Sequence, residues 1–205
     1  MNLIPLVFST GWASGVNAYL VVLALGVADR VGHLQQVPDV LGRLDVLIVA
    51  ALLYAVEFVA DKIPAVDSTW DTISTAIRPT VGAVIAVLVS GDVDTLQQAG
   101  YAVLGGGTAL ASHAVKAGSR LAINASPEPV SNIAASLGED AVVLGVVVLA
   151  IHHPWIALAV CAVLLVVGLV VLTWLLKRVR RSWRRWKGRD PDTGARPPAD
   201  RRGDG

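Results

Sequence analysis

Hydrophobic residues fall into long runs of about twenty, separated by short polar segments. A helical run of this length matches the ~30 Å hydrocarbon core of a bilayer. The sequence contains no ten-residue stretches of alternating hydrophobicity, which a membrane barrel would need. We therefore predict an all-α polytopic membrane helical bundle with six spans, at about residues 3–30, 44–64, 77–91, 95–123, 133–152 and 154–176.

Two parts of the chain resemble one another, at about residues 46–91 and 105–150. In each part a hydrophobic run ends in two charged residues four positions apart, and a proline-containing segment, a short helical stretch and a second run follow. We predict an internal repeat that relates the second and third helices to the fourth and fifth. An inverted repeat stays open, because Asn17-Ala18 also aligns with His113-Ala114.

The two charge pairs have opposite sign: Glu57 and Asp61 in the first part, Lys116 and Arg120 in the second. Residues four apart lie on one face of a helix. A charge within a membrane helix costs about 2.5–3.5 kcal/mol on insertion scales, so it usually faces a partner, a cavity or an ion path. We therefore expect an acid of the first pair within ion-pair distance of a base of the second.

Short helices at the membrane surface are predicted between the spans. Ser68–Asp71 and Ser136–Glu139 have the spacing of a capping box, which starts a helix. Arg78 precedes Pro79, and the residue before a proline disfavours helix. We expect a separate interfacial or re-entrant helix at 68–77, capped near Ser68, with Arg78 turned toward the polar residues of the bundle.

Small residues cluster in the first and fourth runs, at Gly11–Gly15 and Gly105–Gly107. The favoured interpretation is close packing of helices, since small side chains let backbones approach in membranes. The alternative is a helix broken to line a cavity. Polar atoms for that cavity would come from Ser14, Asn17, Thr108 and Ser112.

The composition supports the membrane interpretation, because 54% of the residues are hydrophobic and the mean hydropathy is +0.61. Charge is unevenly distributed: residues 1–176 carry six Lys/Arg and twelve Asp/Glu, whereas residues 177–205 carry eleven Lys/Arg and four Asp. By the positive-inside rule, this basic tail is cytoplasmic. We predict a transmembrane domain at 1–176 in the cell inner (cytoplasmic) membrane and a largely disordered tail at 177–205.

The expected partners are membrane lipids, with anionic headgroups at the basic tail. A homo-oligomer stays open, and we expect no nucleic-acid partner and no cofactor. The single cysteine, Cys161, excludes an intramolecular disulfide.

Several motifs resemble one family of bacterial multi-pass membrane proteins, the domain-of-unknown-function 4126 family. The long run Glu57–Ala83 resembles its signature, and Ser14–Leu20 resembles its N-terminal motif. The second half matches at Gly105–Gly107, His113, Lys116-Ala117, Arg120, Asn132, Ser136-Leu137 and Glu139-Asp140. The resemblance covers about residues 9–145 and implies a multi-pass membrane protein, but no activity.

With the N-terminus inside, ten charged residues gather in the cytoplasmic half of the bilayer: Glu57, Asp61, Lys62, Asp67, Asp71, Arg78, Lys116, Arg120, Glu139 and Asp140. Complete pairing of four bases with six acids leaves two acids over, which invites a proton, a cation or a metal. Asn17 and His113 complete the candidate site, although a hydrogen-bonded packing role is favoured for His113.

The favoured function is a small transporter or permease, coupled to protons or ions, for an anionic small molecule or lipid headgroup. Glu57 would carry the proton, because it lies deepest in apolar surroundings, with Lys116 as its counter-ion. Arg78 and Arg120 would clamp the anionic group, because a guanidinium binds carboxylate or phosphate at two points.

Two other functions stay open. The charges could be internal salt bridges of a structural or assembly protein. The protein could instead be a membrane-embedded lipid-phosphate enzyme, in which Asp67 with Asp71, or Glu139 with Asp140, holds a divalent metal. The enzyme is less favoured, and we predict no catalytic residue, because the sequence contains no HExxH, no GxSxG and no Cys/His cluster.

Overall fold

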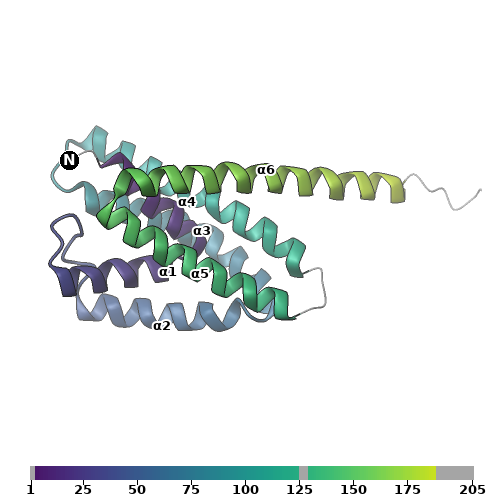
Figure 1. The fold of residues 1–205 in the computed structure, drawn as a ribbon, viewed down its shortest axis with the longest axis horizontal. Coiled ribbons are helices and arrows are strands. Elements are labelled where there is room, and N and C mark those ends of the chain that lie inside the picture. Colours follow the sequence, from purple (N-terminus) through teal and green to yellow (C-terminus); the bar gives the residue numbers. More distant parts are fainter. Residues whose placement is uncertain (1–2, 125–128, 188–205) are drawn as a thin grey trace, which may run out of the picture. The chain divides into compact units, whose positions relative to one another are not determined.

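The computed structural model describes residues 3–124 and 129–187, with side chains placed for 3–63, 66–121, 130 and 132–178. The described residues form helices and no strand, which confirms the all-α prediction (Figure 1). The six helices are α1 (Ile4–Gly32), α2 (Leu44–Ala60), α3 (Pro64–Ser90), α4 (Thr95–Asn124), α5 (Pro129–His152) and α6 (Pro154–Lys187). The chain divides into two compact units, Met1–Leu172 and Thr173–Gly205.

Four of the described helices, α1, α3, α5 and α6, are long and apolar enough to cross a membrane, which indicates an integral membrane protein. The predicted spans in α2 and α4 do not meet both conditions. With 17 residues, α2 reaches only about 26 Å at the helical rise. The length of α4 is sufficient, but Lys116 and Arg120 interrupt its apolar sequence.

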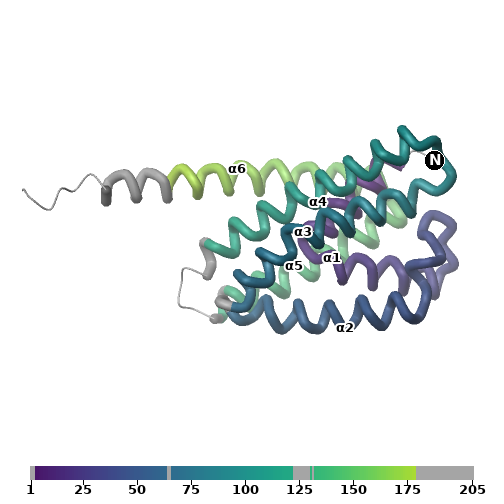
Figure 2. The backbone as a smooth tube through the Cα atoms, turned by 180° about the vertical axis from the view of Figure 1, so that it is seen from behind, coloured from purple at the N-terminus to yellow at the C-terminus, as the bar shows by residue number. Residues whose placement is uncertain are grey.

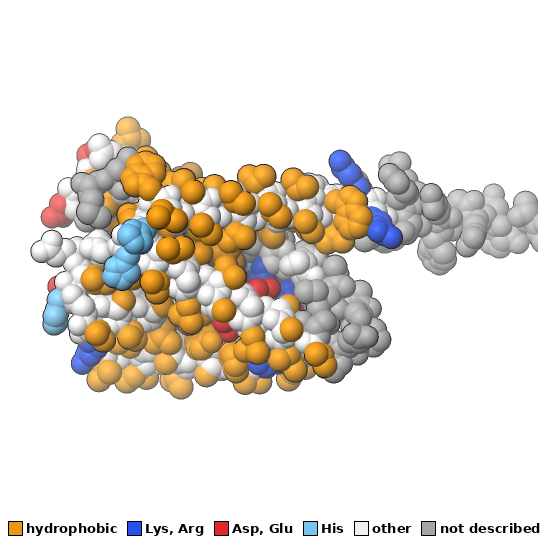
Figure 3. Space-filling model, viewed as in Figure 1, with side chains coloured by type: hydrophobic (Ala, Val, Ile, Leu, Met, Phe, Trp, Pro, Cys, Tyr) orange, Lys and Arg blue, Asp and Glu red, His pale blue; other side chains and the backbone are white. Residues whose placement is uncertain are grey.

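Apolar side chains cover much of the outside of the first unit, as the face in Figure 3 shows. Such a surface suits contact with lipid, since soluble monomers rarely expose large apolar patches. Even the short helix α2 turns large apolar side chains outward, and they are Leu44, Ile48, Val49, Leu52, Val56 and Val59. The apolar surface therefore extends over α2.

Helix α1 is the centre of the first unit and packs against α2, α3, α4 and α5 (Figure 2). Both glycines of its small-residue run face α4. A methyl group at Gly11 would lie 2.6 Å from the carbonyl oxygen of Gly105, and one at Gly15 would overlap Ser112. These contacts confirm the close packing expected for the two small-residue runs.

The prediction of a separate short helix at 68–77 is wrong, because these residues belong to the long helix α3. The helix runs without interruption from Pro64 to Ser90 and contains Pro79 in its interior. A proline removes one backbone hydrogen bond, and membrane helices tolerate this loss because neighbouring groups compensate. Its true start is Pro64, since proline suits the first helical turn. The capping box at Ser68 is therefore not used.

The second predicted capping box is wrong for the same reason. Ser136 lies inside α5, which begins at Pro129. A proline in the first turn thus marks the beginning of both helices better than the Ser-x-x-acid spacing does.

The second unit contains the end of α6. The helix continues to Lys187, so residues 177–187 of the predicted tail are helical rather than disordered. The guanidinium of Arg178 lies 5.2 Å from the centre of the Trp174 ring. The disorder predicted for 188–205 lies outside the described residues.

Candidate functional site

Polar residues from five helices meet inside the first unit and form what we call the polar centre. Its acids come from α2, the turn after it, α3 and α5, and its bases come from α3 and α4. The members are Asn17, Glu57, Asp61, Asp71, Arg78, His113, Lys116, Arg120, Glu139 and Asp140. All except Glu139 are buried, so these charges depend on one another rather than on water.

Arg78 binds two acids from a position that is 1% exposed. Its Nη2 donates to Oε1 of Glu57 at 2.6 Å, and its Nη1 lies 3.2 Å from Oδ1 of Asp71. The inward orientation predicted for Arg78 is therefore confirmed, although the side chain leaves from a continuous helix. Its Nε has no hydrogen-bond partner among the described residues.

Lys116 joins the two charge pairs singled out in the sequence. Its Nζ lies 2.9 Å from Oδ2 of Asp61 and 3.5 Å from Oε1 of Glu57. A third carboxylate, from Glu139, lies 3.6 Å away. The expected approach of an acid of the first pair to a base of the second is confirmed.

Arg120 has its guanidinium donors committed to protein groups. Its Nη2 and Nε bind the two carboxylate oxygens of Glu139 at 2.6 and 3.1 Å. Its Nη1 donates to Oδ1 of Asn132 at 2.6 Å and to the backbone oxygen of Asp61 at 3.2 Å. Such a two-point pair is stronger and more specific in geometry than a single contact. The arginine thus ties α4 to α5 and to the end of α2.

Helix α1 is broken at Asn17, whose φ of −151° and ψ of 98° are not helical. The side-chain oxygen of Asn17 accepts the N–H of Leu20 at 3.0 Å and so caps the second half of the helix. Two carbonyl oxygens at the end of the first half turn to the bases instead. Arg78 donates to Gly15 at 3.4 Å, and Lys116 donates to Val16 at 3.1 Å.

Asp140 accepts two hydrogen bonds from neutral groups. Its oxygens bind Nδ2 of Asn17 and the hydroxyl of Tyr54, each at 3.0 Å. Among the described residues, no Lys or Arg lies within ion-pair distance of this carboxylate. The negative charge of Asp140 is therefore offset by neutral donors and not by a direct base.

His113 is buried, and both of its ring nitrogens have hydrogen-bond partners. Its Nδ1 lies 2.8 Å from Nη1 of Arg78, which can only donate, so Nδ1 must accept. Its Nε2 then carries the proton and lies 3.0 Å from the hydroxyl of Thr75. The imidazole is neutral in this arrangement.

The two remaining charges of the ten expected in the site lie within electrostatic reach of the polar centre. Lys62 lies over the ring of Phe58, 3.0 Å from its centre, and donates to the backbone oxygen of that residue. Among the described residues it makes no ion pair with the acids of the polar centre, but its charge acts on Asp61 and Asp140. Asp67 is buried in the first turn of α3.

Two of the acids expected to hold a metal face arginines. Asp71 faces Arg78, and Glu139 faces Arg120. Within the described residues there is no group of three or more His, Cys, Asp or Glu side chains placed to hold an ion.

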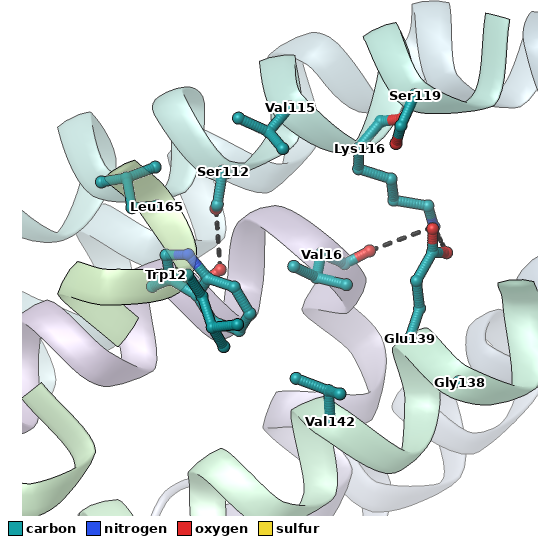
Figure 4. A pocket seen from close by; sticks show the side chains of 11 residues that line it. Trp12, Val16, Ser112, Val115, Lys116, Ser119, Gly138, Glu139, Val142 and Leu165 are labelled. Atoms are coloured by element: carbon teal, nitrogen blue, oxygen red, sulfur yellow. Dashed lines mark hydrogen bonds and ion pairs between the residues drawn. The ribbon is translucent and has the colours of Figure 1, made fainter. Parts of the chain in front are cut away.

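A pocket of about 320 Å³ reaches the polar centre from one side (Figure 4). Its walls are mostly apolar and come from α1, α4, α5 and α6: Trp12, Val16, Ser112, Val115, Gly138, Val142, Leu164 and Leu165, with Ser119 beside the charged groups. Lys116 and Glu139 point toward one another at its charged end. The side chain of Glu139 is 21% exposed, whereas Glu57 is fully buried behind Lys116.

Sequence reasoning missed two contributors to this geometry. Asn132 belongs to the motif of the second half, but its bond to Arg120 depends on how α4 and α5 meet. Tyr54 lies one turn before Glu57, and that helical spacing was the available signal for its inward position.

The fold and the polar centre define an integral membrane helical bundle with a buried, ion-paired core. The chain belongs to the family described as domain of unknown function (DUF4126), whose model matches residues 4–174. No curated protein and no solved structure matches the chain. The family carries no assigned activity, so the function must be argued from the site.

Proposed function

We propose that the protein is a small transporter or permease that exchanges a small cation for protons through the polar centre. The observation that carries this proposal is the break in α1 at Asn17. In many transporters, broken membrane helices place free carbonyls and helix ends around the bound ion. Here the freed carbonyls of Gly15 and Val16 lie among buried carboxylates.

The charge balance favours a positive occupant. The polar centre contains five acids, Glu57, Asp61, Asp71, Glu139 and Asp140, and three bases, Arg78, Lys116 and Arg120. Two acids therefore exceed the bases, and buried charge is stable only when it is balanced. A proton or a small cation supplies that balance.

The arginines suit an anionic solute less well than the sequence suggested. Arg120 has its donors committed to Glu139, Asn132 and Asp61. Arg78 keeps only Nε without a partner. An anion would therefore have to compete with the carboxylates that hold both guanidinium groups, whereas a cation would leave these arginine pairs intact.

The pocket supplies a route from the side. Its volume lies at the lower end of the range for small-molecule sites. It ends at Lys116 and Glu139, so an ion or solute entering it would meet the polar centre directly. We place the protein in the cell inner membrane with its basic tail in the cytoplasm, as the positive-inside rule suggests.

The test is cation–proton exchange in liposomes containing the purified protein and a pH-sensitive dye. An imposed sodium or potassium gradient should change the internal pH, while a gradient of the bulky N-methylglucamine ion should not. Asp140→Asn should abolish the change, because it removes an excess acid. Asp45→Asn is the matched control, since Asp45 is an exposed acid paired with Arg43, and it should leave exchange unchanged.

A wild-type protein that produces no pH change with either small cation would overturn the coupling proposal. The structural role would then be favoured by a specific observation. Seven of the described ion pairs form one network in which every base contacts at least two acids. In that case Asp140→Asn should change thermal stability without any transport phenotype.

A further inference from the structure

The ammonium group of Lys116 is surrounded by oxygen atoms from three parts of the fold. Asp61 lies at 2.9 Å, the backbone oxygen of Val16 at 3.1 Å, Glu57 at 3.5 Å and Glu139 at 3.6 Å. Carboxylates together with a freed backbone carbonyl are also the ligands that membrane transporters give to a small cation. These oxygen atoms form a cage, and the ammonium group of Lys116 occupies it as a positive charge that is covalently attached to the chain.

The cage has more acceptor capacity than Lys116 uses. Oε2 of Glu57 and Oδ1 of Asp61 are buried and have no hydrogen-bond partner in the part of the chain that the structure describes. Unpartnered carboxylate oxygens in a dry interior are costly, because their desolvation is not repaid. Two such atoms beside one ammonium group point to an additional positive ligand.

The pocket gives Lys116 room to leave the cage. Lys116 and Glu139 both line it, and Ser119 provides a further oxygen one turn along α4 (Figure 4). Lysine has a flexible four-carbon stem with a point charge at its end. The side chain can therefore turn toward the pocket and keep an acid beside it. Acidic and basic groups also show within the mostly hydrophobic face of Figure 3.

We infer that the oxygen cage formed by Val16, Glu57, Asp61 and Glu139 is a binding site for one monovalent cation, for which the ammonium group of Lys116 is an attached competitor. When Lys116 turns into the pocket, a small cation takes its place, and when Lys116 returns, the cation is released. This deepens the proposed function and rests on it for the exchange step. Binding itself requires no transport.

The experiment is equilibrium binding of radiolabelled rubidium, sodium and methylammonium to purified Lys116→Met in detergent. Methionine keeps the length and apolar stem of the side chain but removes the charge. One labelled cation should bind per protein, at least roughly tenfold tighter than to the wild type, because no attached competitor remains. Comparison of the three labels identifies the preferred ion.

Thermal unfolding provides a second reading. In N-methylglucamine chloride, Lys116→Met should unfold below the wild type, and the preferred small cation at equal ionic strength should raise its Tm by about 5 °C. Lys62→Met is the matched control, because Lys62 lies over Phe58 and outside the cage. Lys62→Met should bind no more cation than the wild type, and its Tm should not depend on which cation is present.

A folded Lys116→Met that binds none of the three cations, and whose Tm is the same in every salt, would overturn the site. If the variant is purified only as aggregate, Lys116→Met/Asp140→Asn keeps the net charge of the core and leaves the three carboxylates of the cage in place. That variant should bind the same cation. Aggregation of both variants in saturating potassium or ammonium also counts against the site, since the ion should restore the fold.

The outcomes separate this inference from the proposed function. Binding without flux in liposomes would refute transport and leave the cation site in place. Flux without binding by Lys116→Met would refute the site and leave transport in place.

Discussion

Two arginine–carboxylate pairs in this protein share one geometry but lie in different environments. Arg120 binds both oxygens of Glu139, and Arg43 binds both oxygens of Asp45. The first arginine is 1% exposed and the second pair is in solvent. Exposed pairs contribute little because water screens them, whereas breaking a buried pair leaves a charge without compensation.

Replacing each arginine by lysine tests this difference. Arg120→Lys should lower the free energy of unfolding by at least about 2 kcal/mol, because one ammonium cannot reach Glu139 twice and Asn132 as well. Thermal unfolding in detergent, followed by circular dichroism, measures the effect. Arg43→Lys makes the same chemical change in solvent and should leave the Tm as in the wild type. Equal losses in the two variants would contradict the argument.

The pairing of opposite charges could be predicted from the sequence, and the choice of partners could not. Glu57, Asp61, Lys116 and Arg120 are i,i+4 pairs in apolar runs, and their burial requires compensation. The nearest base to Glu57 is Arg78, however, at 2.6 Å. Which acid meets which base depends on the relative rotation of α2, α3 and α4, and no local pattern encodes that rotation.

At the scale of elements, α3 and α4 are held together through backbone contact. A methyl group at Gly105 would lie 2.6 Å from the backbone oxygen of Gly82 and 2.7 Å from the side chain of Ala86. A methyl group at Gly107, two residues further along α4, would have no neighbouring atom within 4 Å. The first glycine is required by packing and the second is not.

Gly105→Ala should therefore destabilise the protein by about 1–3 kcal/mol, because the two helices must separate to make room. Gly107→Ala should be neutral, or should stabilise by up to about 1 kcal/mol through better helix propensity. Denaturation of both variants in the same detergent provides the comparison. A loss at Gly107 as large as that at Gly105 would show that packing against α3 is not the cause.

Helix lengths and breaks show where local signals fail. The six hydrophobic runs predicted the six helices, because burial in lipid sets both length and composition. The Arg78-Pro79 signal predicted a boundary that α3 does not have. Asn17 interrupts α1 although no proline or glycine occupies that position, because its partners Asp140 and Leu20 compensate the break. Tertiary contacts decide both cases.

At the scale of the whole molecule, the packing of α3 against α4 bears on how often the chain crosses the membrane. The two helices are joined by a short turn and contact one another extensively. If α3 crosses the bilayer, α4 must return beside it, despite Lys116 and Arg120. We therefore predict six crossings, with the turn after α3 outside the cell and the basic tail inside.

Single cysteines test this arrangement, because Cys161 is fully buried and should not react. In intact cells, Asp92→Cys should react with a thiol reagent that cannot cross the membrane. Lys177→Cys should react only after the membrane is permeabilised. The unsubstituted chain controls for background labelling. Labelling of both positions from the same side would refute six crossings.

The break at Asn17 also has a consequence for biogenesis. Each half of α1 is shorter than the about 20 residues needed to cross a bilayer, so the segment must enter the membrane as one helix. The groups that stabilise the break, Arg78, Lys116 and Asp140, are synthesised later and on other helices. A nascent chain that ends before α3 therefore lacks all three groups, and the polar centre is complete only when α5 has been synthesised.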